Sequence, residues 1–146
     1  MLVDDLKVLQ ASSAVYSLKA SGFHWNVEGP NFPQYHDFLG ELYDDVYSTI
    51  DKIAEYIRAL DCYAPASLSR YLELTKIPDQ LKVPRAELMF VELYHDTQTL
   101  IDIIMIAFES ATQENQQGIA NFLSERQEIM QKHMWMIKST LKKQRS

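Results

Sequence analysis

The chain has 146 residues and a formal net charge of −6, with 47% hydrophobic and 23% charged residues. This is the composition of an ordinary globular protein, which excludes a disordered or low-complexity chain, and we expect residues 1–146 to form a single domain. No apolar run approaches the roughly 18 residues that a membrane span requires, and the first residues lack the pattern of a signal peptide.

Apolar residues recur at alternating steps of three and four along most of the chain, which is the period of an amphipathic α-helix. Four such runs predict helices over residues 2–27, 38–60, 90–111 and 119–141. Glycine or proline falls between the first two runs, at Gly29 and Pro30, and between the last two, at Gly118. Both of these connections are short.

The connection between the second and third runs, residues 62–84, is much longer and contains three prolines. Within it, residues 65–71 can form two turns of helix, with Pro65 near the first position. A plain up-and-down bundle does not need so long a connection. The pattern therefore predicts an all-α fold, a ferritin-like four-helix bundle with a long crossover that contains a short helix between helices 2 and 3.

Charge is unevenly distributed. Residues 132–146 contain five Lys or Arg and no acid, so the other 131 residues carry nine basic and twenty acidic groups. An acidic body argues against a broad nucleic-acid-binding surface and is compatible with attracting cations. Cys62 is the only cysteine, so no disulfide can form within the chain, and a reducing cytoplasm is the simplest location, with the nucleoid as an alternative within it.

Two histidines and two carboxylates have a spacing that fits a shared metal site. His24 and His36 lie six residues either side of Pro30, so they should face each other across the turn between two antiparallel helices. On a wheel of about 100° per residue, Asp51 and Glu55 share one face of the second helix, away from its apolar stripe. A solvated surface pair is the alternative interpretation of these two acids.

A single chain cannot complete this site. Asp51 is fifteen residues from His36, or about 22 Å along a helix at 1.5 Å per residue. If two copies of the helix pack antiparallel about a two-fold axis near residues 43–45, His36 of one copy lies beside Asp51 and Glu55 of the other. Such nitrogen and oxygen ligands suit ferrous iron, with manganese or zinc as competitors.

These residues resemble the Dps proteins, the DNA-protecting mini-ferritins of starved bacterial cells. The resemblance rests on residues 24–32, His-Trp-Asn-Val-Glu-Gly-Pro-Asn-Phe, followed by His36 and by Asp51-Lys-Ile-Ala-Glu55, and it extends over nearly the whole chain. It implies a hollow homododecamer built from two-fold dimers, which oxidises Fe(II) at ferroxidase centres, preferably with hydrogen peroxide, and stores ferric mineral. By position, His24 and His36 would come from one subunit, and Asp51 and Glu55 from its neighbour, as both catalytic and metal-binding residues.

Two positions depart from the family pattern. Gly40 stands where the family often has an acid that helps to hold a second iron, so we expect one tightly bound iron and a transient second. Asn121 is neutral where the family lines its three-fold pores with aspartates. Glu114, Glu125 and Glu128 are the alternatives for the path by which iron enters.

The remaining candidates receive structural interpretations. We expect His133 to be a hydrogen-bonded core residue and Asp96, beside His95, to be solvated. Trp25 is interpreted as an interface aromatic, with electron donation as the alternative, and the pair Tyr43 and Tyr47 as packing across the dimer.

DNA binding is expected to be weak or absent, because twelve copies carry a charge of about −72, which repels phosphate. The basic end, with Lys138, Lys142, Lys143 and Arg145, is explained by favourable interaction with a helix dipole. A DNA-compacting shell with residual ferroxidase activity is the alternative function. A metal-free structural bundle would require the four site residues to be a coincidence. No contact with membranes is expected.

Overall fold

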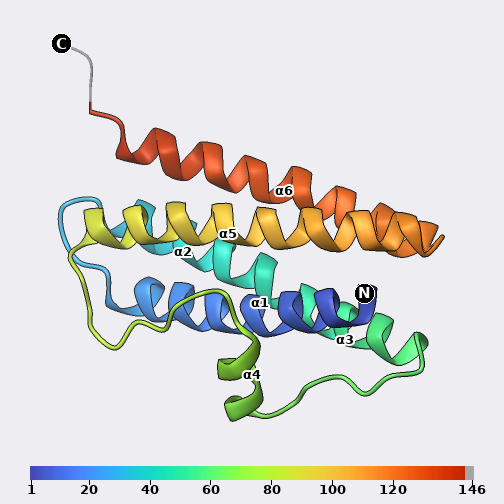
Figure 1. Cartoon of the computed structure of the whole chain (residues 1–146). Coiled ribbons are helices and arrows are strands. Elements are labelled where there is room, and N and C mark those ends of the chain that lie inside the picture. Colours follow the sequence, from blue (N-terminus) through green and yellow to red (C-terminus); the bar gives the residue numbers. More distant parts are fainter. Residues whose placement is uncertain (144–146) are drawn as a thin grey trace.

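The computed structural model describes residues 1–143, so Arg145 of the basic end lies outside the described residues. Within this range all regular structure is helical, and the elements are α1 (Leu2–Asn26), α2 (Phe32–Tyr47), α3 (Thr49–Ala59), α4 (Leu68–Leu74), α5 (Ala86–Gln113) and α6 (Gln117–Leu141). The bundle consists of α1, α2 with α3, α5 and α6, while α4 lies in the crossover outside it (Figure 1). The predicted all-α ferritin-like architecture is confirmed.

The crossover returns the chain along the length of the bundle. It leaves the end of α3 and forms α4 on the outer side of α1. It then reaches the opposite end of the bundle, where α5 begins (Figure 1). As a result α5 runs in the same direction as α2 and α3. This is why the connection needs far more residues than the two turns that join antiparallel neighbours.

The second predicted helix is divided at Ser48 into two helices, α2 and α3. The Ser48 hydroxyl donates to the Asp45 carbonyl at 2.6 Å, and the Thr49 hydroxyl donates to the Val46 carbonyl at 2.7 Å. Two adjacent hydroxyls that bind carbonyls of the preceding turn compete with the helical hydrogen bonds and bend the axis. Asp51 and Glu55 therefore lie beyond a bend, on α3.

The crossover helix begins later than predicted, at Leu68 instead of Pro65. Ser67 is its N-cap, and the Ser67 hydroxyl accepts a hydrogen bond from the Arg70 amide at 3.2 Å. A serine cap satisfies a backbone donor of the first turn, which proline at the start of the segment cannot do. The cap therefore sets the first residue of α4.

The core is formed by the apolar stripes that the sequence predicts. In α2 and α3, Leu42, Val46, Ile53 and Ile57 are at most 1% exposed. Burial of each such side chain contributes about 1.5–3 kcal/mol to the free energy of unfolding. None of the helices in residues 1–143 is long and apolar enough to span a membrane.

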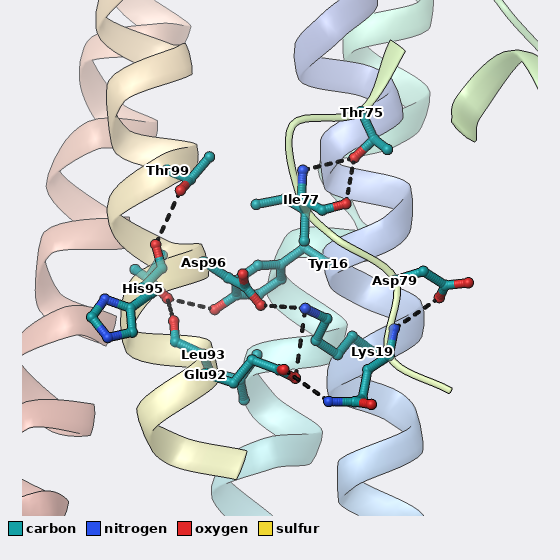
Figure 2. A network of polar contacts seen from close by, with 12 residues as sticks. Tyr16, Lys19, Thr75, Ile77, Asp79, Glu92, Leu93, His95, Asp96 and Thr99 are labelled. Atoms are coloured by element: carbon teal, nitrogen blue, oxygen red, sulfur yellow. Dashed lines mark hydrogen bonds and ion pairs between the residues drawn. The ribbon is translucent and has the colours of Figure 1, made fainter. Parts of the chain in front are cut away.

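A buried polar network joins α1, α5 and the crossover (Figure 2). The Lys19 ammonium lies 2.8 Å from Asp96 and 3.6 Å from Glu92, and the Gln80 amide of the crossover donates to Glu92 at 2.9 Å. The prediction of a solvated Asp96 is wrong, because α1 packs against this side of α5 and buries the carboxylate. Burial raises the pKa of Asp96, although the hydrogen bond from Lys19 opposes this shift.

A second polar cluster joins α2 to α6 just before the bend. Arg126 Nη1 and Nη2 donate to the two oxygens of the Asp45 carboxylate at 2.8 Å each, and His133 Nε2 donates to the same carboxylate at 2.7 Å. His133 is hydrogen-bonded, as predicted, but it is only partly buried and is not a core residue. Burial disfavours the Asp45 carboxylate, but the hydrogen bonds from His133 and Arg126 outweigh it and hold the pKa of Asp45 well below its usual range.

The lowered pKa of Asp45 gives a testable dependence of stability on pH. Because the folded-state pKa lies below the unfolded value of about 3.9, Asp45 stabilises the fold above that pH, and its contribution is lost as the pH falls toward the folded-state pKa. We expect Asp45→Asn to lower the free energy of unfolding at pH 7 by on the order of 1–2 kcal/mol. Urea unfolding at fixed protein concentration should show that the variant loses less stability than the parent between neutral and acidic pH; equal losses would contradict this role of Asp45.

Candidate metal centre

His24 and His36 form a closely packed pair at the turn between α1 and α2. His24 lies in the last turn of α1, and His36 lies near the start of α2. Their rings stack with centroids 3.9 Å apart and planes 15° apart. Phe32 also stacks against His36, with the ring centroids 5.0 Å apart. The sequence-based prediction that the two histidines lie level across the turn agrees with this geometry.

Each histidine binds the backbone of the other. His24 Nδ1 lies 2.6 Å from the His36 carbonyl oxygen, and His36 Nδ1 lies 2.7 Å from the His24 carbonyl oxygen. A carbonyl can only accept, so in both rings Nδ1 carries the proton and donates it. In the neutral imidazole this leaves the Nε2 lone pair free, which is the state that binds a metal ion. We call this reciprocal arrangement of His24 and His36 the histidine clasp.

The clasp also completes the end of α1. The last four carbonyls of a helix have no partner within it. The His24 carbonyl is one of these, and the His36 imidazole supplies its donor. A histidine that binds the final carbonyls of a helix also interacts favourably with the helix dipole. The same hydrogen bond therefore stabilises the fold locally and orients the His36 ring.

The stacked arrangement limits how the clasp can bind metal. A ring nitrogen binds an ion in the plane of its ring, at about 2.1 Å. Because the two rings are nearly parallel and their centroids are 3.9 Å apart, no ion can lie in both planes at that distance. Each Nε2 is available to a separate ion, and coordination of one ion by both histidines requires one ring to rotate.

An open groove of about 550 Å³ lies beside the clasp. It is lined by His24, Trp25, Asp37, Gly40, Glu41, Tyr43 and Asp44. Its three acidic residues are exposed and come from one side of α2, so the approach to His24 carries negative charge. Such a field attracts cations toward the groove.

Asp51 and Glu55 lie elsewhere, on α3. Both side chains are exposed. Within residues 1–143 no three His, Cys, Asp or Glu side chains gather closely enough to hold a metal ion. One chain therefore presents two imidazoles at one place and two carboxylates at another, and a centre with all four would need a second copy.

The aromatic residues near the clasp remain available for contacts with a second copy. The Trp25 side chain is 66% exposed. Tyr43 and Tyr47 lie on α2 with ring centroids 5.7 Å apart. Their interpretation as interface residues stays a prediction, as does electron donation by Trp25.

The other candidate residues take no part in the clasp. His95 points away from the Lys19 network (Figure 2). Glu114 accepts a hydrogen bond from the Leu2 amide at 2.9 Å, which ties it to the start of α1. Asn121, Glu125 and Glu128 are exposed on α6, so the path by which iron enters stays a prediction.

Sequence reasoning missed two features of the centre. It did not identify the backbone carbonyls as partners of the histidines, although the position of His24 in a last helical turn is a usable signal for such a bond. It treated Gly40 only as a missing acid, whereas the structure places the His24 ring directly against this residue.

This chain is similar over most of its length to a family model and to known bacterial proteins. The family model of the ferritin-like domain matches residues 3–146. A DNA protection during starvation protein of Brevibacillus brevis is 29% identical over 131 residues, covering 90% of this chain and 88% of the relative. A low temperature-induced protein of Nostoc is 32% identical over 136 residues, covering 92% of this chain and 76% of the relative.

Solved structures of Dps proteins have the same fold as this chain. Dps from Staphylococcus aureus superimposes with a TM-score of 0.94 at 30% identity, covering 98% of this chain and 96% of that chain. Dps from Vibrio cholerae, described as a member of a broad superfamily of ferritin-like diiron-carboxylate proteins, gives a TM-score of 0.92 at 26% identity, with 97% of this chain and 89% of that chain covered. The predicted resemblance is confirmed: this chain belongs to the ferritin-like family and, within it, to the Dps proteins.

Proposed function

We propose that this protein oxidises Fe(II) and stores the ferric product inside a hollow homododecamer, and thereby protects against oxidative stress. The observation that carries the proposal is the histidine clasp, in which both Nδ1 atoms are bound to carbonyls and both Nε2 atoms are free for metal. The description of the Vibrio cholerae relative as a diiron-carboxylate protein supports iron as the metal.

In this proposal each centre is shared between two subunits. His24 and His36 of one subunit supply neutral imidazoles, and Asp51 and Glu55 of its two-fold neighbour supply carboxylates. An isologous interface repeats each contact, so a dimer has two such centres. The exposure of Asp51 and Glu55 in the single chain supports their availability to a neighbour.

The chemistry requires charge stabilisation more than proton transfer. Two Fe(II) ions each lose one electron, and hydrogen peroxide, which we infer to be the preferred oxidant, accepts both as its O–O bond breaks to give two hydroxides. The Asp51 and Glu55 carboxylates offset the added positive charge on iron. The clasp holds the neutral imidazoles in the tautomer that leaves Nε2 open to a metal ion before iron arrives.

Substitution of three of the four site residues, His24, Asp51 and Glu55, tests this function. His24→Ala, and the double variant Asp51→Ala with Glu55→Ala, should slow peroxide-driven Fe(II) oxidation at least about tenfold, because each removes ligands from the centre. The rate is followed by the absorbance of ferric oxide. His95→Ala is the matched control, since His95 is exposed and outside the clasp. Site variants that oxidise iron as fast as the parent would disprove the assignment.

The shared centre also predicts an assembly. Large apolar side chains, among them Leu18, Trp25 and Trp135, are each more than 60% exposed in the single chain, and their burial would favour association. Light scattering should give a particle near twelve times the chain mass of 16.9 kDa. A stable monomer would be incompatible with centres formed between subunits.

A DNA-compacting shell with residual ferroxidase activity is the second candidate, favoured by the name of the Brevibacillus brevis relative. Lys138, Lys142 and Lys143 lie at the end of α6 or just beyond it, but the chain as a whole carries −6.

Because an acidic shell repels phosphate, we expect weak or absent binding of plasmid DNA in gel-shift experiments at physiological salt. Binding that persists from low to moderate salt would favour the DNA-compacting function instead.

A further inference from the structure

Gly40 lies directly under the His24 imidazole. A Cβ atom at position 40 would meet His24 Cε1 at 2.8 Å and His24 Nδ1 at 3.0 Å. These distances are shorter than ordinary van der Waals contacts, which begin near 3.5 Å. In the conformation that it adopts in this structure, the His24 ring therefore occupies the space that a Cβ atom at position 40 would require.

The His24 ring cannot move aside without losing its contacts. Its Nδ1 donates to the His36 carbonyl, and its face stacks on the His36 ring. Gly40 lies inside α2, four residues after His36, so its own position is set by the helix. A methyl group at position 40 would displace the His24 ring rather than the backbone, and would break the hydrogen bond at its Nδ1.

We propose that Gly40 is a positioning residue, whose lack of a side chain admits the His24 ring and so sets the direction and tautomer of the histidine clasp. This inference rests on the proposed function, since it concerns how the same imidazoles are prepared for metal. Gly40 itself touches no reacting atom and acts only through His24.

The other helical glycines provide controls. A Cβ atom at Gly22, in α1, or at Gly118, in α6, would meet nothing within 4 Å. Replacement of a helical glycine by alanine usually stabilises a helix, because alanine loses less conformational freedom on folding. Gly22→Ala and Gly40→Ala thus share the same helix-propensity gain, and only Gly40→Ala disturbs an imidazole.

A double-mutant cycle tests the proposal without metal. Gly22→Ala should raise the Tm by about 2–4 °C, and Gly40→Ala should raise it less or lower it, because the clasp is lost. In a His24→Ala background the ring is absent, so Gly40→Ala should then raise the Tm as much as Gly22→Ala does. An equal effect of Gly40→Ala in both backgrounds would overturn the proposal.

Metal binding is the second readout, with Co²⁺ under anaerobic conditions as the probe. Its visible absorption reports nitrogen ligation, and titration of the assembled protein gives the affinity. Gly40→Ala should bind Co²⁺ about tenfold more weakly than the parent, as expected when the partner that orients a metal ligand is lost, whereas Gly22→Ala should match the parent. Unchanged affinity in Gly40→Ala would overturn the positioning role.

The proposed metal centre and the positioning role of Gly40 can be disproved separately. If His24→Ala binds Co²⁺ as tightly as the parent, the proposed metal centre is wrong, and the thermal cycle still decides whether Gly40 positions His24. If His24→Ala loses Co²⁺ binding and Gly40→Ala does not, the proposed function stands and the role of Gly40 is wrong.

Discussion

The reciprocal exchange between two imidazoles and two carbonyls is the interaction on which the candidate centre depends. It joins the end of α1 to the start of α2 through hydrogen bonds of 2.6 and 2.7 Å. It satisfies a carbonyl that the helix leaves without a partner, and it selects one tautomer for both rings. A single local arrangement thus serves both the hairpin and the proposed metal-binding role of the histidines.

The position of α1 explains why so many polar residues are buried in this bundle. This helix contacts α2, α3, α4 and α5, so almost no side of it faces solvent. Gln10 donates to the Pro65 carbonyl and to the Tyr71 hydroxyl of the crossover, and Lys19 pairs with Asp96. Because unpaired buried polar groups are costly, these partners hold the crossover to the bundle in a defined register.

The separation of imidazoles and carboxylates within one chain makes the proposed function dependent on association. The clasp lies at the turn between α1 and α2, whereas Asp51 and Glu55 lie beyond the bend at Ser48. Under the proposed function, a subunit alone has two incomplete halves of a centre, and a two-fold pair has two complete ones. The proposed arrangement would couple iron oxidation to assembly, so that the reaction would occur where the mineral can be enclosed.

The sequence by itself determined the helices, the long crossover, the face shared by Asp51 and Glu55, and the facing positions of His24 and His36. These follow from periodicity, breakers and spacing along one chain, which are local properties. The family followed from a motif whose residues are close in sequence. The four site residues as one centre remain a prediction, since that contact lies between chains.

Only the tertiary structure decided the burial of Asp96, which α1 covers. The serine cap of α4 and the two hydroxyls that bend the second helix are local contacts, but helical periodicity alone does not predict them. From the sequence alone, Gly40 is a position that lacks the acid often found in the family. Its contact with the His24 ring arises from the packing of α1 on α2. Helical periodicity shows which side of a helix is apolar. The burial of the Asp96 carboxylate and the space for the His24 ring depend instead on which side chains a neighbouring helix packs against them.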